Sequence, residues 1–368
     1  MPASPAPGLG GPLVRDVSEE QLLAAIFPLL PAGAATLVGP GDDAAVVAAP
    51  DGRFVVSTDV LVEDRHFRRA RSTGYDVGRR AAAQNLADVA AMGARPTALV
   101  VSLVVPGDVP VAWVTGLARG LAEACSPVGA AVVGGDLSGG DAIVVAVTVH
   151  GDLEGREAVL RSGARPGDVV AHTGVLGWGA AGFALLEAGA VPDAAAGDPG
   201  PALLAARHLV PEPPLDAGPA AARAGATAML DVSDGLLRDA GRLARASGVV
   251  VDLDPELLDA DASLTTAARA VAPDGDPDAV VRAWVLGGER TTGSWRRSPP
   301  GRCSRPATAP SGRSAPRARA RRRACSWRAR SPTSRPAGTT SPQAPDAPSS
   351  GRRVAGSGWV SPGGSAPR

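Results

Sequence analysis

The chain has 368 residues, of which 45% are apolar, 3% are aromatic, 37 are basic and 37 are acidic. This length predicts two domains, at roughly 100–200 residues per domain. No apolar run approaches the about 20 residues of a membrane-spanning helix. The first residues also lack the basic and apolar regions of a signal peptide, so we expect a cytoplasmic protein with no membrane contact. The three cysteines fit neither a disulfide framework nor a zinc site.

The sequence contains no lysine, so all 37 basic residues are arginine. A Walker-type phosphate-binding loop needs a lysine before its Ser or Thr. A pyridoxal enzyme needs a lysine for its Schiff base, and a protein kinase needs a strand lysine beside the nucleotide phosphates. The composition therefore excludes these three classes of protein.

Charge divides the chain into two unlike parts. Residues 1–289 contain 20 arginines and 36 acidic residues, a net charge of −16, whereas residues 290–368 contain 17 arginines and one acidic residue, a net charge of +16. The second part has two branched aliphatic residues, Val354 and Val360, and no Leu, Ile, Met, Phe or Tyr. It cannot bury enough apolar surface to offset a chain entropy of roughly 1–2 kcal/mol per residue. We therefore expect residues 290–368 to form a disordered tail rich in Arg, Pro and Ser.

The first part opens with a flexible leader and an N-terminal unit of mixed strands and helices. We expect the leader at residues 1–16, and Ser18 as the N-cap of a short amphipathic helix that ends near residue 30. The unit spans residues 17–152. Its remaining expected elements are a turn and strand at 38–49, strands at 53–62 (with a polar break at 57–59), 97–105, 130–133 and 142–150, helices at 75–92 and 111–124, and a Gly-rich loop at 134–140.

A second unit follows over residues 153–289 and has the same mixed character. Its expected elements are strands at 168–172, 226–231 and 248–253, helices at 179–188, 201–209, 236–247 and 279–286, and a linker at 191–200. Together the two units predict an α/β fold with mixed α+β sheets, two domains and a disordered tail.

Seven aspartates are placed by this pattern at strand ends or in turns: Asp42, Asp43, Asp59, Asp88, Asp136, Asp231 and Asp234. Turns at strand ends are where α/β proteins assemble their sites. Each aspartate alone more often caps a helix or closes a turn. Together, however, several carboxylates at one junction are costly unless a cation or a proton compensates their charge. Mg²⁺ prefers oxygen ligands and shares them with substrate phosphates.

Three further features leave their alternatives open. The Gly134–Gly140 segment is either a common hairpin or, beside the aspartates, a phosphate site that glycine backbone amides can approach closely. His66 is either a surface histidine or part of a site. Arg161 is either a solvated arginine or a phosphate clamp.

Between residues 37 and 289 the sequence resembles the thiamine-monophosphate kinase family. That family belongs to a superfamily with aminoimidazole-ribotide synthetase, selenide water dikinase and a hydrogenase maturation factor. The resemblance rests on these motifs, in family order: GPGDDAAVV, STDVLVEDRHF, AAQNLADVAAMGARP, VVGGDLSGGD, RSGARPGD, RHLVPEPP, LDVSDGL and LGGE.

The resemblance implies an aminoimidazole-ribotide-synthetase-like architecture and an ATP-dependent kinase that converts thiamine monophosphate to thiamine diphosphate by direct in-line transfer. It implies Mg²⁺, ATP as co-substrate, and a homodimer that pairs the N-terminal sheets. The magnesium ligands that it implies are Asp43, Ser57, Thr58, Asp59, Asp88, Asp136, Asp231 and Asp234. It implies ATP contacts at Gly135, Asp136, Arg161 and Ser233, and thiamine-phosphate contacts at His66 and Glu289.

The sequence departs from the family at two places. Trp178 stands where the family has an acidic or small polar residue. After Glu289 the family continues with an aspartate and an apolar strand, whereas Arg290 follows here and the similarity ends. An all-arginine chain indicates G+C-rich coding, and out-of-frame reading of such DNA yields the Arg, Pro, Ser, Ala, Gly and Thr of this tail. We therefore expect a reading-frame shift near codon 290 and a truncated C-terminal domain.

Other functions stay open on the sequence alone. The chain could be another ATP-dependent enzyme of the superfamily, or an inactive nucleotide-binding remnant because its C-terminal domain is incomplete. An arginine-rich tail can also bind nucleic acid. We disfavour that last function because Trp295, Trp327 and Trp359 are too far apart in the sequence to form a stacking platform.

Overall fold

The computed structural model describes residues 11–40, 44–191, 200–254, 258 and 260–288, and the backbone of 327–330. All of these residues belong to one compact unit, Met1–Pro332. None of the described helices is both long enough and apolar enough to cross a membrane.

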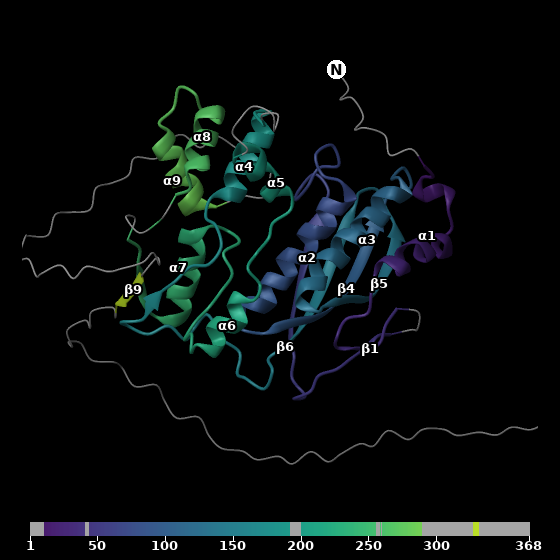
Figure 1. The fold of residues 1–368 in the computed structure, drawn as a ribbon, viewed down its shortest axis with the longest axis horizontal. Helices are drawn as coiled ribbons and strands as arrows, with labels where there is room; N and C mark the ends of the chain where they lie inside the picture. The colour runs from purple at the N-terminus through teal and green to yellow at the C-terminus, as the bar shows by residue number, and fades with distance from the viewer. Residues whose placement is uncertain are drawn as a thin grey trace, which may run out of the picture. The chain divides into compact units, whose positions relative to one another are not determined.

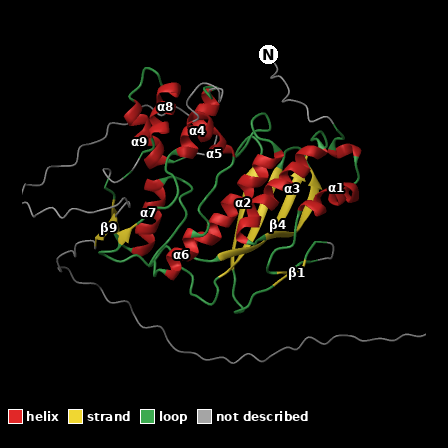
Figure 2. Cartoon of the chain, in the orientation of Figure 1, coloured by secondary structure: helices red, strands yellow, loops and turns green. Residues whose placement is uncertain are grey.

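The N-terminal part is a four-stranded sheet with two long helices on one face (Figure 1). The sheet has the order β3 (Val55–Val62), β6 (Val144–Asp152), β4 (Arg95–Val105) and β5 (Ala131–Gly139). Strand β4 runs parallel to β5, and both β3 and β4 pair antiparallel with β6. The helices α2 (Gly74–Ala91) and α3 (Val111–Cys125) cover the face that holds the main hydrophobic core (Figure 2). This agrees with the strands and helices expected from the sequence.

Helices α2 and α3 touch backbone to backbone because glycines line their contact. A Cβ at Gly78 would lie 2.1 Å from the carbonyl oxygen of Leu117, and one at Gly120 would lie 2.2 Å from that of Tyr75. Helix α2 ends where Gly93 takes a left-handed φ of 78°, as the glycine predicts. The two helices therefore form a rigid cover over the sheet, and α2 carries one of the predicted site residues, Asp88.

Shorter elements precede the sheet. They are η1 (Val14–Asp16), α1 (Glu19–Ile26), η2 (Phe27–Leu29) and the hairpin of β1 (Thr36–Val38) and β2 (Val46–Val47), and η3 (Ser126–Val128) follows α3. Ser18 caps α1 in a capping box with Gln21, as predicted. The described end of the expected leader is held in place, because the Val14 amide donates to the Val109 carbonyl at 2.8 Å and the Arg15 amide to that of Gly107 at 3.0 Å.

The C-terminal part is mainly helical. Its helices are α4 (Trp178–Ala188), α5 (Gly200–Leu209), α6 (Ala217–Arg223), α7 (Leu236–Ser247), α8 (Ala262–Val271) and α9 (Pro277–Gly287). Leu185, Leu204 and Leu264 are fully buried in a second core between α4, α5, α8 and α9. Trp178 begins α4 and packs against this core. The sequence pattern did not indicate α6 or α8.

A small sheet lies at the end of the C-terminal part. It has the order β7 (Val169–Val170), β9 (Trp327–Arg330) and β8 (Val250–Asp252), with both pairings antiparallel. The central strand comes from the segment that the sequence predicts to be disordered throughout. Residues 289–326 and 331–368 of that segment lie outside the described residues.

Three local expectations differ from the structure. Residues 134–139 continue β5 instead of forming a loop, because β4 runs alongside them; a Cβ at Gly135 would lie 2.0 Å from the Val101 carbonyl oxygen. The polar residues 57–59 do not interrupt β3, which pairs with β6 along its whole length. Residues 226–231 form no strand, although the Met229 amide donates to the Leu160 carbonyl at 3.2 Å.

Candidate functional site

Strand β3 and helix α2 bring two predicted carboxylates together. Alternation along β3 places Ser57 and Asp59 on the face that α2 covers. The Ser57 hydroxyl donates to Oδ2 of Asp88 on α2 at 2.8 Å. The Asp59 backbone amide donates to Oδ1 of the buried Asn85 at 3.2 Å. Asn85 therefore fixes β3 against α2 at the site, a role that the sequence analysis did not assign.

Electrostatics connect this pair with Asp231 of the C-terminal part. Burial, opposed by the hydrogen bond from Ser57 and aided by the charges of Asp231 and Asp59, raises the pKa of Asp88 to about 6. Burial, followed by the charge of Asp231, also raises the pKa of Asp59. Carboxylates that repel one another in a half-buried place are stabilised by a cation. These three aspartates are therefore the centre of the candidate site.

Arg161 lies within electrostatic range of this centre. Its charge acts on Asp88 in the sense that lowers the pKa of that carboxyl. The backbone around Arg161 is fixed, because its carbonyl accepts from the Ser247 hydroxyl at 2.7 Å and the same hydroxyl accepts from the Ala164 amide at 3.1 Å. A guanidinium that acts on Asp88 is placed to meet an anionic substrate at this centre.

His66 faces the same centre from the turn after β3. Its Nδ1 accepts from the Val62 backbone amide at 2.9 Å. Burial and the charge of Arg80 lower the pKa of His66, whereas the hydrogen bond from Val62 and the charge of Asp59 act in the opposite sense. The ring is therefore neutral at pH 7, and because Nδ1 is an acceptor, Nε2 carries the proton.

Ser233 and Asp234 lie in the turn before α7. The buried Asp239 accepts from both of their backbone amides, at 3.0 Å and 2.9 Å. Asp234 itself forms ion pairs with Arg242 and, at 3.4 Å, with Arg238. Asp239 was missed from the sequence. The signal for it was an aspartate one turn inside a helix, directly after the LDVSDGL motif.

Thr58 and the β5 residues lie apart from the carboxylate centre. The Thr58 side chain is on the other face of β3, where its hydroxyl donates to the Val147 carbonyl at 2.9 Å. Asp136 is exposed on β5 and accepts from the Ser138 hydroxyl at 3.2 Å. Gly135 and Asp136 line a cavity of about 690 Å³, whose walls include Val114, Leu117 and Ala118 of α3.

Two predicted site residues, Asp43 and Glu289, lie outside the described residues. Among the described residues, no three His, Cys, Asp or Glu side chains are arranged to hold a metal ion by themselves. The described donors are oxygen atoms, and the raised pKa values of Asp59 and Asp88 mark uncompensated negative charge. This donor set fits Mg²⁺, which keeps several waters and takes further ligands from substrate phosphates.

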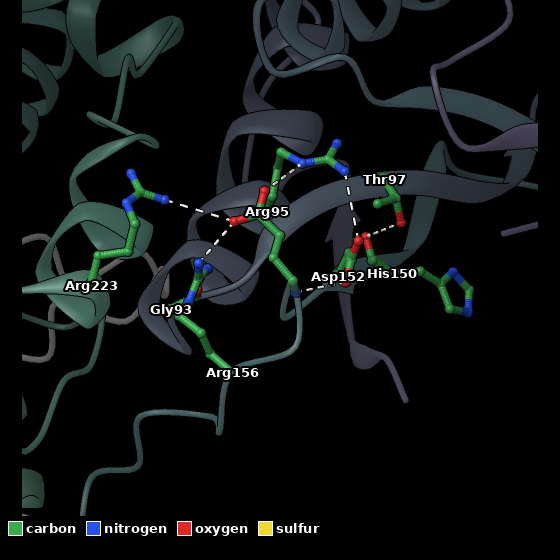
Figure 3. Close-up of polar contacts among 8 residues, drawn as sticks. Gly93, Arg95, Thr97, His150, Asp152, Arg156 and Arg223 are labelled. Atoms are coloured by element: carbon green, nitrogen blue, oxygen red, sulfur yellow. Dashed lines mark hydrogen bonds and ion pairs between the residues drawn. The ribbon is translucent and has the colours of Figure 1, made fainter. Parts of the chain in front are cut away.

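An arginine cluster holds the N- and C-terminal parts together near the site. Glu154 has a left-handed φ of 53° after β6 and pairs with Arg156 at 2.9 Å, Arg95 at 3.3 Å and Arg223 of α6 at 3.7 Å. Arg156 also donates to the Gly93 carbonyl at 3.1 Å (Figure 3). These contacts, together with the close approach of Gly218 on α6 to the Ala90 carbonyl of α2, bring the C-terminal part to the helix that carries Asp88.

Comparisons with known proteins match both parts of the chain. The family profile described as AIR synthase related protein, N-terminal domain, matches residues 41–153, and the corresponding C-terminal domain profile matches residues 165–276. A thiamine-monophosphate kinase from Mycobacterium tuberculosis is 52% identical over 256 residues, which cover 69% of this chain and 73% of that protein. One from Corynebacterium glutamicum is 40% identical over 281 residues, covering 76% and 81%.

Solved structures give the same result. AaThiL complexed with AMPPCP and TMP superimposes with a TM-score of 0.58 at 32% identity, covering 68% of this chain and 77% of that one. The thiamine-monophosphate kinase from Stenotrophomonas maltophilia gives a TM-score of 0.60 at 31% identity, covering 73% and 81%. The hydrogenase maturation protein HypE, at 20% identity, shares the fold. The chain belongs to the thiamine-monophosphate kinase family.

Proposed function

We propose that this protein is an ATP-dependent kinase that phosphorylates thiamine monophosphate to thiamine diphosphate. The observation that carries the proposal is the meeting of Asp59 and Asp88 with Asp231 of the C-terminal part, which gives a half-buried anionic centre in a chain of this family. A reaction between two phosphate groups brings together two polyanions, and its main requirements are charge compensation and alignment.

Mg²⁺ is the cofactor that this donor set favours. We propose Asp43, Ser57, Asp59, Asp88, Asp231 and Asp234 as its ligands. The resemblance also implies Thr58 and Asp136, but the Thr58 hydroxyl is bound to the Val147 carbonyl on the other face of β3 and Asp136 is exposed on β5, apart from this centre. When bound, it neutralises and aligns the reacting phosphates. The terminal phosphate of thiamine monophosphate is already ionised at neutral pH, so direct in-line transfer needs neither a covalent phospho-enzyme nor a general base.

The surrounding residues suggest how each substrate binds. The apolar cavity beside Gly135 and Asp136 has room for the nucleoside of ATP, while Arg161 and Ser233 contact its phosphates. Neutral His66 presents an Nε2–H that can donate to the thiamine phosphate without adding charge. We propose Glu289 as the second contact to that substrate.

The tail after Glu289 affects whether this chain is active. We propose that residues 290–368 result from a reading-frame shift, that the C-terminal domain over residues 153–289 is truncated, and that activity is weak or absent. Support comes from the arginine-rich composition that begins at Arg290 and from the curated relatives, which match 69% and 76% of the chain. One sequencing read across codon 290 tests this: an unbroken frame with no shifted similarity contradicts it.

A coupled ADP-release assay on purified protein tests the activity. The chain with its frame restored is expected to release ADP with thiamine monophosphate and not with unphosphorylated thiamine. Turnover with another acid or amide, found in a substrate panel, would favour a different enzyme of the superfamily. Binding of an ATP analogue by calorimetry without any product would favour an inactive nucleotide-binding remnant. Full turnover by the present chain would contradict the proposed effect of the tail.

We also propose that the protein is a cytoplasmic homodimer that pairs its N-terminal sheets. The sheet face opposite α2 exposes an apolar row, with Val56 at 55% and Val60 at 44% exposure, flanked by Thr58 and His150. Light scattering of the native protein is expected to give twice the chain mass. The substitution Val60→Asp is expected to give monomers, whereas Val250→Asp, far from this face on β8, is the control that retains the dimer.

A further inference from the structure

A second layer of residues holds the turn that carries Ser233 and Asp234. We infer that Asp239 and Arg242 of α7 are positioning residues for the ligand groups of this turn. The turn precedes α7, and its Gly235 provides no side chain to cap the helix. Asp239, one turn further on, accepts hydrogen bonds from the backbone amides of both Ser233 and Asp234.

Asp239 is fully buried, and its carboxylate accepts hydrogen bonds from this turn and from Arg242 of the same helix. Its other carboxylate oxygen accepts from Arg242 at 2.7 Å. A buried carboxylate is strongly unfavourable unless it is paired and hydrogen-bonded. Here a guanidinium and two amides bind it, so the buried carboxylate connects the turn to α7.

Arg242 joins this buried carboxylate to the exposed end of the turn. One guanidinium nitrogen binds Asp239 and the other binds the Asp234 carboxylate. The planar fork fixes both carboxylates at once, which the single ammonium of a lysine cannot do. Arg242 thus balances the charge of Asp234 and limits where its oxygens can point.

The back of the turn is equally restrained. A Cβ at Gly235 would lie 2.2 Å from the Gly287 carbonyl oxygen, and one at Gly288 would lie 2.4 Å from the Gly235 Cα. The turn before α7 is therefore pressed against the end of α9, immediately before Glu289. Asp239 therefore holds the Ser233 and Asp234 amides on one side of the turn, and Gly287 and Gly288 pack closely against Gly235 on the other.

Hydrogen exchange tests the structural part of the inference without any ligand. In Asp239→Asn the side chain has the same shape but no charge, and its amide nitrogen, a donor, must face either the two turn amides or the guanidinium of Arg242. Exchange in peptides covering residues 231–235 is expected to accelerate at least about tenfold. The control Asp261→Asn makes the same change of side chain at the start of α8, where the Ser263 amide donates to Asp261 at 2.8 Å, and should leave those peptides unchanged. Unchanged exchange in Asp239→Asn overturns the inference.

Metal dependence tests the ligand part, which rests on the proposed function. Binding of a non-hydrolysable ATP analogue is titrated with Mg²⁺ by calorimetry. Loss of an outer residue that orients a ligand weakens metal affinity about 10- to 100-fold, so the Mg²⁺ concentration for half-saturation should rise by about tenfold or more in Asp239→Asn and stay unchanged in Asp261→Asn. Faster exchange with an unchanged Mg²⁺ requirement would reduce Asp239 to a structural role and overturn the inference.

A second variant, Arg242→Lys, tests the same inference if Asp239→Asn does not fold. Lysine retains the positive charge beside Asp239 but cannot also hold Asp234, so the Mg²⁺ requirement should rise several-fold while the melting temperature stays close to that of the native protein. An unchanged Mg²⁺ requirement in this variant contradicts the inference. A native protein that binds no magnesium nucleotide would instead remove the proposed function, and the exchange experiment would still decide whether Asp239 holds the turn.

Discussion

The two sheets of this protein differ in what supports them. In the N-terminal sheet, β4 pairs along its length with β5 and β6, and Val145, Val147 and Val149 of β6 are fully buried. In the C-terminal sheet, β7 and β8 each pair with β9 and with no other strand of the described residues, while Val169 is 69% and Val250 is 52% exposed. The first sheet is complete within residues 55–152. The second depends on a strand from beyond residue 289.

Within the C-terminal part, the helices and the sheet differ in how they are stabilised. The helices of the C-terminal part retain a closed core of their own around Leu185, Leu204 and Leu264. The sheet of the C-terminal part has no such core among the described residues. Burial of apolar surface stabilises by roughly 25 cal/mol per Å², so short strands with exposed valines gain little from it. Loss of the family sequence after Glu289 is therefore expected to weaken the C-terminal sheet first.

The largest expected effect comes from restoring the reading frame after residue 289. The restored chain should recover ADP release with thiamine monophosphate by at least about 100-fold, because the residues that complete the site and its sheet return together. Hydrogen exchange at β7 and β8 should slow in the same protein, whereas exchange at β4 and β6 should not change.

A chain that ends at Gly288 is the matched control for this experiment. It should resemble the present chain in activity and in exchange at the N-terminal sheet. If the truncated, present and restored chains all released ADP equally fast, the difference between the two sheets would have no functional meaning.

The next effect contrasts one substitution in the two parts. Gly78→Ala on α2 places a methyl group 2.1 Å from the Leu117 carbonyl oxygen and should lower the free energy of unfolding by about 3 kcal/mol. Gly241→Ala on α7 meets only the flexible end of Arg245 at 3.3 Å and should raise it by about 0.5–1 kcal/mol. Urea denaturation measures both. Equal changes in the free energy of unfolding for Gly78→Ala and Gly241→Ala would show that α2 and α3 can move apart to accept the methyl group without loss of stability.

The sequence predicted best those elements that a short local motif determines. The Ser18 capping box, the stop at Gly93 and the helix at residues 236–247 were all local, and the structure has all three. The glycines of residues 134–140 predict a loop, and only the neighbouring strand β4 explains why residues 134–139 continue β5 and why glycine is needed there. Packing between distant segments was the missing information.

The candidate site follows the same rule. Repeated aspartates and the family motifs indicated Asp59, Asp88 and Asp231, which the structure brings into electrostatic contact. The residues that orient them, Asn85 and Asp239, carry no motif of their own in the sequence. They act through backbone amides, and which amide a side chain reaches is decided by the folded chain alone.

The anionic centre should also cost stability in the absence of ligand. Burial raises the pKa of Asp88 to about 6, above its value in the unfolded chain, so the folded state holds the proton more tightly and stability falls as pH rises from about 4 to 6. Asp88→Asn has no carboxyl to titrate and so removes this loss of stability. Its free energy of unfolding should equal that of the native protein near pH 4 and be about 1–2 kcal/mol higher above pH 6. The difference is smaller than the full pKa shift of Asp88 implies, because solvent screens the site.

Urea denaturation in metal-free buffer across this pH range measures the difference. Asp108→Asn is the control, since that carboxylate is exposed near Arg69, and it should show no such trend. A constant difference between Asp88→Asn and the native protein at every pH would mean that Asp88 does not titrate in this window.

The smallest expected effect lies in the arginine cluster that joins the two parts. Arg223 is more than half exposed and reaches Glu154 only at 3.7 Å, so Arg223→Ala should lower the free energy of unfolding by less than about 0.5 kcal/mol. Arg156→Ala should cost about 1 kcal/mol or more, because Arg156 also binds the Gly93 carbonyl at the end of α2. Thermal unfolding at low and high salt distinguishes the two, since only the Arg223 effect should vanish with salt. A larger loss of unfolding free energy in Arg223→Ala than in Arg156→Ala would contradict this expectation. It would mean that charge holds α6 to the N-terminal part, and that the close contact at Gly218 results from that attraction.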